Sequence, residues 1–477
     1  MSGKYDAIVV GSGSNGIAAA IRLQKKGLKT AIFEQAATPG GATRTMELTM
    51  PGFKHDVGSA ILPLGLASPF FRDLPLDNFG LEWIFPEIAY AHPFDDGTAF
   101  GCYKDIEKTA AQLGEDEAAY LKLFRPLLNN WDKLNSDLLG PLGIPEHPIP
   151  FLKFGLKAMP SAQMLANHYF KNDKTKAFFY GSAAHSTLPL TNIASASFGL
   201  VLTTSAHKYN WPFPKGGAGN FTKALLDYYK SLGGEIFLSQ YIRDIRDLPN
   251  AYAYLFDLTP KQLLKIKGLN FNLLYRKRME AYKYGAGVFK MDWALKEPIP
   301  FTNEKCRKAA TIHLGFTKEE IENSEKEIHQ KNMTSTPYVL VAQHSPFDPT
   351  RAPEGHHTAW AYIHVPNGST EDYTKIVEDQ IERAAPGFKE TILARSTLNT
   401  SDLQQFNPNL IGGDINGGKQ DITQLFTRPI AKLSPYATPD PRVYICSSST
   451  PPGGGVHGMC GYHAAEKALK DHFRDLS

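Results

Sequence analysis

Residues 5–34, YDAIVVGSGSNGIAAAIRLQKKGLKTAIFE, decide the fold class of this chain. The stretch opens with a β-branched run typical of a buried parallel strand, which leads directly into the pattern G-x-G-x-x-G at Gly11, Gly13 and Gly16. Apolar residues at helical spacing follow the glycines, and residues 29–34 form a second strand-like run. This order predicts a βαβ unit at the start of an α/β fold.

The three glycines and the acid that closes the second strand predict a dinucleotide site. Gly11 permits the tight turn, Gly13 lets the backbone approach a pyrophosphate, and Gly16 lets helix and strand pack closely. The helix N-terminus directs free N–H groups and the positive end of its dipole toward the phosphates. Glu34 can accept hydrogen bonds from ribose hydroxyls and would repel a 2′-phosphate, which disfavours NADP. The complete order of elements favours binding over a βαβ unit without a ligand, and the site then includes the intervening Ser12 and Asn15.

The loop that follows this unit indicates FAD rather than NAD. A second glycine pair, Gly40 and Gly41, is followed by Arg44 and by the motif HDVGS at 55–59. An NAD domain would continue with another βα repeat, whereas this loop can run along a longer cofactor. No second G-x-G-x-x-G follows a strand in the sequence, so we expect no separate pyridine nucleotide domain.

Residues 442–473 show the same arrangement of strand, glycine loop and helix near the end of the chain. VYIC at 443–446 is strand-like, SSSTPP at 447–452 forms a turn before the glycines, and alanines at helical spacing follow Gly458. Backbone amides in such a loop can lie against an electron-rich ring edge or a phosphate. A mobile tail would not continue into an amphipathic helix, so we expect this loop to belong to the cofactor site.

Composition limits the other functions that are open to the chain. Its 477 residues are 42% hydrophobic and 21% charged, with a net charge of +3, which fits a globular enzyme and argues against nucleic acid as a partner. The four cysteines lie far apart without a C-x-x-C, and no histidine group has suitably spaced carboxylates, so we expect neither a disulfide framework nor a metal site. We expect a cytoplasmic location, because the cysteine usage fits a reducing compartment and no signal peptide or membrane span is evident.

The proline-rich segment 140–160, GPLGIPEHPIPFLKFGLKAMP, is open to more than one interpretation. A packed loop is the commonest structure for such a stretch. It can also line an apolar pocket or make a peripheral contact with a membrane surface. The sequence does not indicate the oligomeric state.

Taken together, the motifs resemble those of a known family. GSGSNG with Glu34, PGGATRT at 39–45, GFKHDVGS at 52–59 and the glycine loop at 449–465 resemble the flavin motifs of the phytoene desaturase-like branch, related to carotenoid desaturases and isomerases, of the FAD-dependent amine oxidase superfamily. The resemblance extends over essentially the whole chain. It implies a Rossmann-type discontinuous FAD-binding domain at 1–65, 206–265 and 431–477, with an interleaved α+β substrate domain at 66–205 and 266–430.

The resemblance also implies which residues contact an extended FAD molecule. Gly11, Gly13, Gly16 and Glu34 would hold its ADP half, and Ile242 would border the adenine. Further along the cofactor come Gly41 and Arg44 beside the pyrophosphate and ribityl chain, Gly58 and Ser59 near the ring, and Gly454, Gly455 and Val456 at its pyrimidine end.

The activity implied by the resemblance is that of an FAD-dependent oxidoreductase. Such an enzyme, like phytoene dehydrogenase, would remove or transfer a hydride on an apolar small-molecule substrate. Two alternatives stay open: a flavin amine oxidase acting on a polar amine, and a non-catalytic FAD-binding interaction protein. A carotenoid-sized tunnel would favour the first function, a short aromatic cage with a buried carboxylate the second, and a sealed flavin the third. His457 is the candidate catalytic residue, because its loop should face the flavin.

Overall fold

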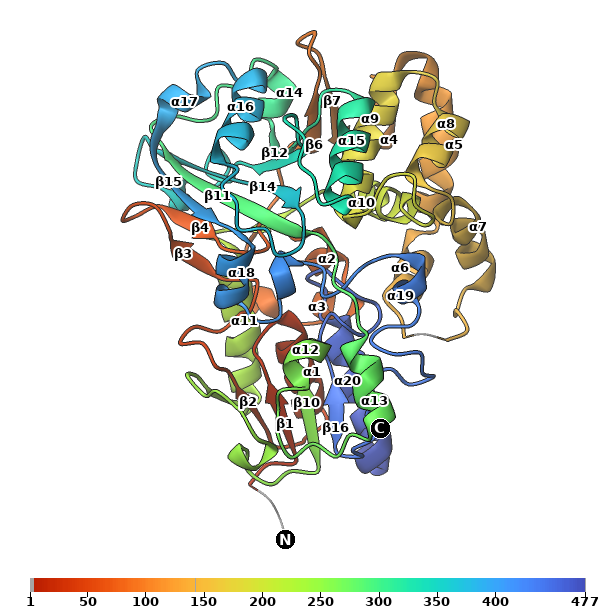
Figure 1. Cartoon of the computed structure of the whole chain (residues 1–477), viewed down its shortest axis with the longest axis vertical. Coiled ribbons are helices and arrows are strands. Elements are labelled where there is room, and N and C mark those ends of the chain that lie inside the picture. Colours follow the sequence, from red (N-terminus) through yellow and green to blue (C-terminus); the bar gives the residue numbers. More distant parts are fainter. Residues whose placement is uncertain (1–3, 142, 477) are drawn as a thin grey trace.

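The computed structural model describes residues 4–141 and 143–476, which form two parts stacked along the long axis of the molecule (Figure 1). One part is built on a five-stranded sheet and lies near both chain termini, and the other is built on a seven-stranded sheet with helices around it. This confirms the predicted α/β class, with a Rossmann-type domain and an interleaved α+β domain. Within the described residues, no helix is both long and apolar enough to span a membrane.

The five-stranded sheet draws its strands from distant stretches of the chain. All of its neighbouring strands are parallel, so their carboxyl ends lie at one edge. These strands fall within the expected segments 1–65, 206–265 and 431–477, whose limits stay a prediction. The strand order is β16 (Val443–Ile445), β10 (Ala253–Phe256), β1 (Ala7–Val10), β2 (Thr30–Phe33) and β9 (Glu235–Phe237).

Helices cover both faces of this sheet, as expected for buried parallel strands. On one face, α1 (Ser14–Gln24) packs against α20 (Met459–His472) and α11 (Ala218–Ser231). The contact between α1 and α20 brings the two ends of the chain together. The contact between α1 and α20 is close, because a Cβ atom at Gly461 would lie 1.8 Å from the carbonyl oxygen of Asn15. On the other face, the strands pack against α12 (Pro260–Leu263) and α13 (Leu273–Glu280).

The seven-stranded sheet is antiparallel except where β6 runs parallel to β12. Side chains alternate along its strands, so Phe289, Met291 and Trp293 enter a core beneath α16 (Thr374–Ala384) and α17 (Phe388–Thr391), whereas Val288 and Lys290 face the other side. The strand order is β15 (Ile392–Leu398), β11 (Gly287–Leu295), β14 (His357–Val365), β13 (Val339–Ala342), β12 (Ala309–Leu314), β6 (Ile88–Pro93) and β7 (Ala99–Tyr103).

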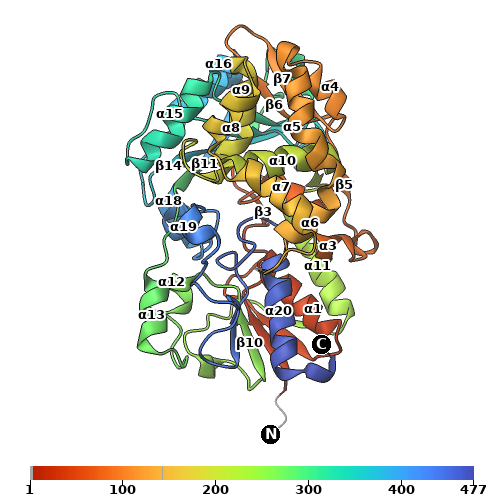
Figure 2. The ribbon, with the colours of Figure 1, turned by 90° about the vertical axis from the view of Figure 1, so that its right-hand side faces the viewer.

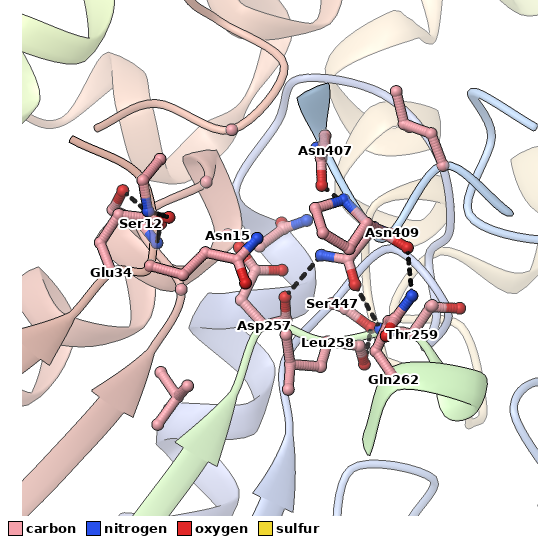
Figure 3. A pocket seen from close by; sticks show the side chains of 18 of the residues that line it. Ser12, Asn15, Glu34, Asp257, Leu258, Thr259, Gln262, Asn407, Asn409 and Ser447 are labelled. Carbon is pink, nitrogen blue, oxygen red and sulfur yellow. Dashed lines mark hydrogen bonds between the residues drawn. The ribbon is translucent and has the colours of Figure 1, made fainter. Parts of the chain in front are cut away.

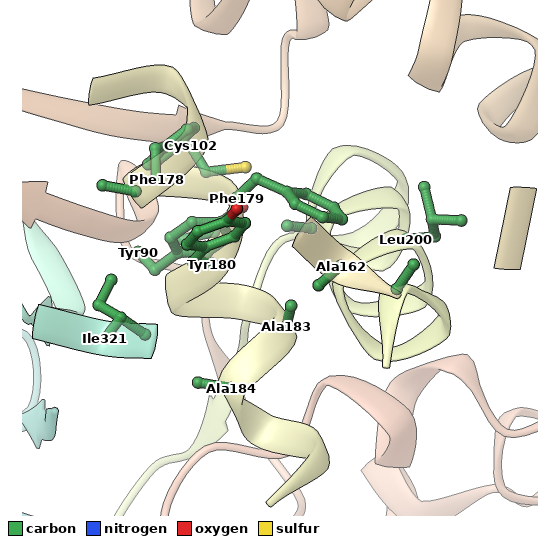
Figure 4. Close-up of a cluster of buried hydrophobic side chains, with 14 of the residues drawn as sticks. Tyr90, Cys102, Ala162, Phe178, Phe179, Tyr180, Ala183, Ala184, Leu200 and Ile321 are labelled. Atoms are coloured by element: carbon green, nitrogen blue, oxygen red, sulfur yellow. The ribbon is translucent and has the colours of Figure 1, made fainter. Parts of the chain in front are cut away.

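A layer of helices covers that other side through an aromatic core. Figure 4 shows Tyr90 and Cys102 of the sheet meeting Phe178 and Phe179. The helices of this layer are α4 (Ile106–Ala110), α5 (Glu117–Asn129), α6 (Trp131–Leu138), α7 (Pro148–Ala158), α8 (Ala162–Tyr169), α9 (Asp173–Ala183), α10 (Ala196–Tyr209) and α15 (Lys318–His329).

The segment 140–160 is therefore not the packed loop that is commonest for its composition, because α7 occupies most of it. Pro148 and Pro150 stand in the first turn of α7, where a missing N–H costs no helical hydrogen bond. Short elements complete the fold: the pairs β3 (Thr45–Glu47) with β4 (Lys54–Asp56) and β5 (Trp83–Ile84) with β8 (Phe213–Pro214), and the helices α2 (Pro63–Ala67), α3 (Pro69–Arg72), α14 (Glu304–Arg307), α18 (Thr400–Phe406) and α19 (Ile422–Leu425).

Candidate functional site

The larger of two adjoining cavities lies at the carboxyl edge of the five-stranded sheet (Figure 3). It encloses about 750 Å³, and its walls come from the loops that follow β1, β2, β9, β10 and β16. A segment of the other part of the molecule, 404–410, lines it as well. Open α/β sheets bind their ligands at this edge, because the loops and helix N-termini converge there. We call this space the first cavity.

The amino end of α1 lines the first cavity. Gly13 is the N-cap residue, no side chain caps the helix, and its first turn contains no acid. Asn15 donates from Nδ2 to Ser448 Oγ over 3.4 Å, and its buried Oδ1 has no hydrogen-bond partner among the described residues. The positive end of the helix is therefore available to an anionic ligand such as a phosphate.

Two glycines in this region are required by close packing. A Cβ atom at Gly13 would lie 2.6 Å from Asp257 Oδ2, so a larger residue would push into the cavity wall. Gly16 faces away from the cavity, and its Cβ would lie 2.1 Å from the carbonyl oxygen of Gly11. That position allows α1 to pack directly on the end of β1.

Glu34, at the end of β2, is held in the wall of the first cavity by local hydrogen bonds. Its Oε2 accepts from both the backbone N–H and the hydroxyl of Ser12 at 2.8 Å, and its Oε1 accepts from the Ala36 N–H at 2.8 Å. These bonds orient a carboxylate that keeps further lone pairs for ligand hydroxyls. Ile242 lines the same cavity, as an adenine neighbour would.

The two parts of the molecule are joined across the first cavity. Asn409 donates from Nδ2 to the Asp257 carbonyl and accepts from the Thr259 N–H, both at 2.9 Å (Figure 3). Arg44 donates to the carbonyls of Gly41 and Phe406 at 2.9 and 2.8 Å, and its guanidinium stacks on the Phe406 ring at 3.7 Å. These contacts position the segment 404–410 over the opening of the sheet.

The second cavity continues from the first, with which it shares Ser14, Ala42, Phe406, Leu410, Ile415 and Ser448. It encloses about 270 Å³ between the two parts of the molecule. Most of its wall is apolar and aromatic, with Trp211, Trp360, Tyr362 and Leu340 among the lining residues. Gly58, Ser59, Gly455 and Val456 also line it.

The polar groups of the second cavity are few. Lys290 has the one charged side chain among the described lining residues, and none of these is Asp or Glu. Its Nζ donates to Asp292 Oδ2, and both side chains are almost completely buried. Burial lowers the pKa of Lys290 and raises the pKa of Asp292 to about 6, whereas the attraction between the two charges opposes both shifts.

A buried charge network continues behind this pair. His55 Nδ1 lies 3.5 Å from Asp292 Oδ1, and Arg351 donates to Asp56 at 2.8 Å. Burial, together with the positive charges of Lys290 and Arg351, lowers the pKa of His55 to about 3, so this imidazole is neutral. The network holds Lys290 at a defined position in the cavity wall.

Comparison with known proteins agrees with this geometry. An NAD(P)-binding Rossmann-like domain model matches residues 9–74. The rat protein named "Pyridine nucleotide-disulfide oxidoreductase domain-containing protein 2" is 24% identical over 98% of this chain and 94% of its own length. A phytoene desaturase (lycopene-forming) from Paracoccus sp. is 22% identical over 95% of each chain. The solved structure of putrescine oxidase bound to putrescine has a TM-score of 0.62 at 16% identity and covers 98% of each chain.

Over nearly its whole length the chain is similar to a phytoene desaturase, and it has the fold of putrescine oxidase. The chain is an FAD-dependent oxidoreductase, and we call it the flavoprotein. Its residues fit the cofactor, because the uncapped end of α1, the unpartnered Asn15 oxygen and Glu34 match a dinucleotide, and the first cavity continues into a second that suits a ring. When bound, FAD supplies the capacity to accept a hydride from a substrate.

The flavoprotein brings most of the predicted contact residues to these cavities. Gly11, Ser12, Gly13, Asn15, Glu34, Gly41, Arg44 and Ile242 line the first, and Gly58, Ser59, Gly455 and Val456 line the second. Gly16 and Gly454 line neither; a Cβ at Gly454 would lie 2.8 Å from the Asn416 carbonyl oxygen. The individual contacts to FAD stay predictions.

His457 lies in the expected loop but outside the residues that line the two cavities. Its Nδ1 accepts from the Met459 N–H at 3.0 Å, which leaves the ring proton on Nε2 to be donated to the Gly453 carbonyl at 3.1 Å. Burial lowers the pKa of His457 to about 4. The geometry is that of a neutral ring that fastens the glycine loop, and a catalytic role stays a prediction.

Two residues of the flavoprotein site were not expected from the sequence. Asp257, at the end of β10, lines the first cavity and accepts from the Gly16 N–H at 3.1 Å. Burial, with the nearby Glu34 charge, raises the pKa of Asp257 to about 7. An acid directly after a buried strand was a usable signal for Asp257. The second residue is Lys290, for which β11 offers the signal of a lysine and an aspartate two residues apart within an apolar strand.

Proposed function

We propose that this flavoprotein oxidises a compact, apolar substrate in the second cavity, with hydride transfer to FAD. The observation that carries the proposal is the wall of that cavity, which is aromatic and aliphatic, encloses about 270 Å³ and includes no carboxylate among its described residues. Such a wall binds through burial of apolar surface and excludes water from the reacting carbon.

The cavity volume limits the size of the substrate. Ligand pockets commonly span roughly 300–1,000 Å³, and here the flavin ring and the substrate would share about 270 Å³. The Paracoccus relative is named for phytoene desaturation, and the apolar wall supports a substrate of related polarity. The volume favours a compact substrate over a long polyene held at full length.

The charge of the wall argues against the amine oxidase alternative. A substrate ammonium group would meet the Lys290 side chain and no lining carboxylate among the described residues. Asp292 is already committed to Lys290 and does not line the cavity. Lys290 Nζ is instead suited to donate a hydrogen bond to an oxygen on an otherwise apolar molecule.

The third alternative, an FAD-holding interaction protein, requires a sealed ring. Here Gly58, Ser59, Gly455 and Val456, which the resemblance assigns to the ring, line a cavity together with Trp360 and Tyr362. This arrangement gives a substrate access to the ring position and supports catalysis. In the proposed reaction the substrate would pass a hydride to FAD and release a proton to solvent, and one new double bond would form between the two atoms that lose them.

The test is anaerobic reduction of the bound flavin by a panel of compounds, followed by its absorbance. We expect compact apolar alkenes or ketones to bleach the flavin and to yield products two hydrogens lighter. Val288→Trp, which fills the second cavity, should abolish bleaching by substrate but not by dithionite, whereas Leu393→Trp at an exposed site should change neither. Bleaching by polar amines alone would overturn the proposal, and so would bleaching by long polyenes alone.

A further inference from the structure

Helix α7 presents apolar side chains to solvent. Leu156 is 71% exposed, Ile149 67% and Leu152 65%, and their spacing of three and four residues places them on one face. The opposite face, with Phe154 and Ala158, is buried in the aromatic core. A surface helix normally carries polar residues where these three side chains lie.

Neighbouring residues extend this exposed surface. Ile144 is 95% exposed before the helix, and Met159 and Met164 are exposed after it. We call Ile144, Ile149, Leu152, Leu156, Met159 and Met164 the apolar face. Figure 2 shows α7 and α8 together on the side turned toward the viewer. Contiguous exposed apolar residues mark a contact with another surface more often than isolated ones do.

A groove adjoins the apolar face. It encloses about 620 Å³, its apolar wall includes Leu127 of α5, Leu134 of α6 and Leu165 of α8, and Leu156 and Met164 of the apolar face line it as well. Lys153, Lys157 and His168 lie among its lining residues. Apolar surface and basic groups thus occupy the same side of the molecule.

The charged residues of the segment 148–171 are all basic, and one exposed acid, Glu146, lies just before it. Residues 148–171 contain Lys153, Lys157 and Lys171 but neither Asp nor Glu. Lys153 is exposed and has no ion-pair partner within residues 4–141 and 143–476, while Lys157 bonds to Tyr169 and Lys171 lies 3.7 Å from Glu115. Lysines beside exposed leucines can keep their aliphatic stems at an apolar boundary with the ammonium groups at its polar edge.

We propose that the apolar face docks on an anionic lipid bilayer, with α7 lying in the plane of the membrane interface. The apolar side chains would enter the acyl boundary while Lys153 and Lys157 meet lipid phosphates. A second copy of the chain is a poorer occupant, because a two-fold interface would bring the same unneutralised lysines together. The proposal is independent of the substrate proposed above.

The proposed contact also has a structural connection to the second cavity. α7 packs directly on α10, and Leu202 of α10 lines the second cavity. The membrane surface would then lie one helix layer from the place where an apolar substrate binds. An apolar substrate dissolved in the bilayer would be concentrated on this side of the molecule.

The test is flotation of the full-length holoprotein with vesicles of phosphatidylcholine, with and without phosphatidylglycerol. We expect binding to the anionic vesicles that weakens with added salt, because charge attraction contributes to it. Leu152→Ser combined with Leu156→Ser should lower partitioning by about tenfold or more, because two buried leucines are lost. Lys153→Glu should lower it about fivefold or more on anionic vesicles alone.

The matched control is Leu273→Ser combined with Leu274→Ser, two exposed leucines of α13 in the other part of the molecule. This variant should float like the wild type. FAD content and thermal unfolding of every variant establish that the protein is folded. Absence of flotation by the folded wild type would overturn the proposal, and equal flotation of the α7 and α13 variants would overturn it too. A solution dimer that dissociates in the α7 variant, without vesicle binding, would identify a second copy as the occupant instead.

Discussion

The two adjoining cavities differ in what builds their walls. The first is made largely of backbone: glycines, strand ends and the uncapped end of α1. The second is made largely of side chains that arrive from α10, β11, β12, β13, β14 and α18. A backbone cradle depends on a short stretch of chain, whereas a side-chain wall depends on how distant elements pack. Under the proposed function, this contrast separates binding of the ADP half of FAD from selection of the substrate.

The largest expected effect tests the backbone cradle. In Gly16→Val the new Cβ would lie 2.1 Å from the carbonyl oxygen of Gly11, which cannot yield without moving β1. We expect loss of FAD and a large fall in stability, because backbone clashes in a packed core are among the most damaging changes. The measurement is FAD per chain after gel filtration, with the exposed α20 variant Lys470→Ala as control. Full FAD occupancy in Gly16→Val would show that FAD binding does not depend on the backbone of the first cavity.

The next effect tests the side-chain wall. Lys290→Met leaves Asp292 buried without its partner, which should lower the free energy of unfolding by about 3–5 kcal/mol. The double variant Lys290→Met with Asp292→Leu should recover most of that loss, because no unpaired charge then stays buried. Urea unfolding measures both. FAD content should stay near that of the wild type, because the ADP half of FAD would be held in the first cavity, which Lys290 does not line. Loss of FAD as complete as in Gly16→Val would contradict the contrast between the two cavities.

A smaller effect sharpens the role of one side chain within the first cavity. Glu34→Gln should weaken FAD binding by about 1.5–3 kcal/mol, because charge-assisted bonds to ribose hydroxyls are lost. The protein should still fold and refill when excess FAD is added. Titration of the apoprotein followed by fluorescence measures the change, and Glu47→Gln at an exposed position serves as control. Unchanged affinity in Glu34→Gln would remove this carboxylate from the cofactor site.

The smallest effect concerns pH. Burial gives Asp257 a pKa of about 7 in the protein without FAD, and a phosphate bound at α1 would raise that pKa further. FAD then binds more tightly to the protonated form, so affinity should be constant below pH 6 and fall above pH 7 by at most about tenfold per pH unit. Asp257→Asn should bind FAD with little dependence on pH. A wild-type affinity that is flat from pH 6 to pH 9 would contradict this assignment.

Much of the wall of the first cavity was predictable from the sequence, because many of its residues are close together in the chain. Gly11, Gly13 and Glu34 follow strands at fixed offsets, and parallel strands bring their carboxyl ends to one edge. The C-terminal glycine loop was predictable for the same reason, as Gly455 and Val456 show by lining the second cavity. The function of His457 was less accessible, because hydrogen bonds to Gly453 and Met459 depend on the folded loop.

Local sequence therefore determines the βαβ unit, the need for glycine at its turns and the acid that follows β2 in the wall of the first cavity. These depend on interactions between residues a few positions apart, which leave a periodic pattern in the chain. Only the tertiary structure decides that Lys290 meets Trp360 and His185 in one cavity, that Asp257 lies against Gly13, and that Leu152 faces outward. The physical reason is that burial and charge environment are set by strands and helices that pair across hundreds of residues, and a hydrophobic pattern alone does not specify what covers each face.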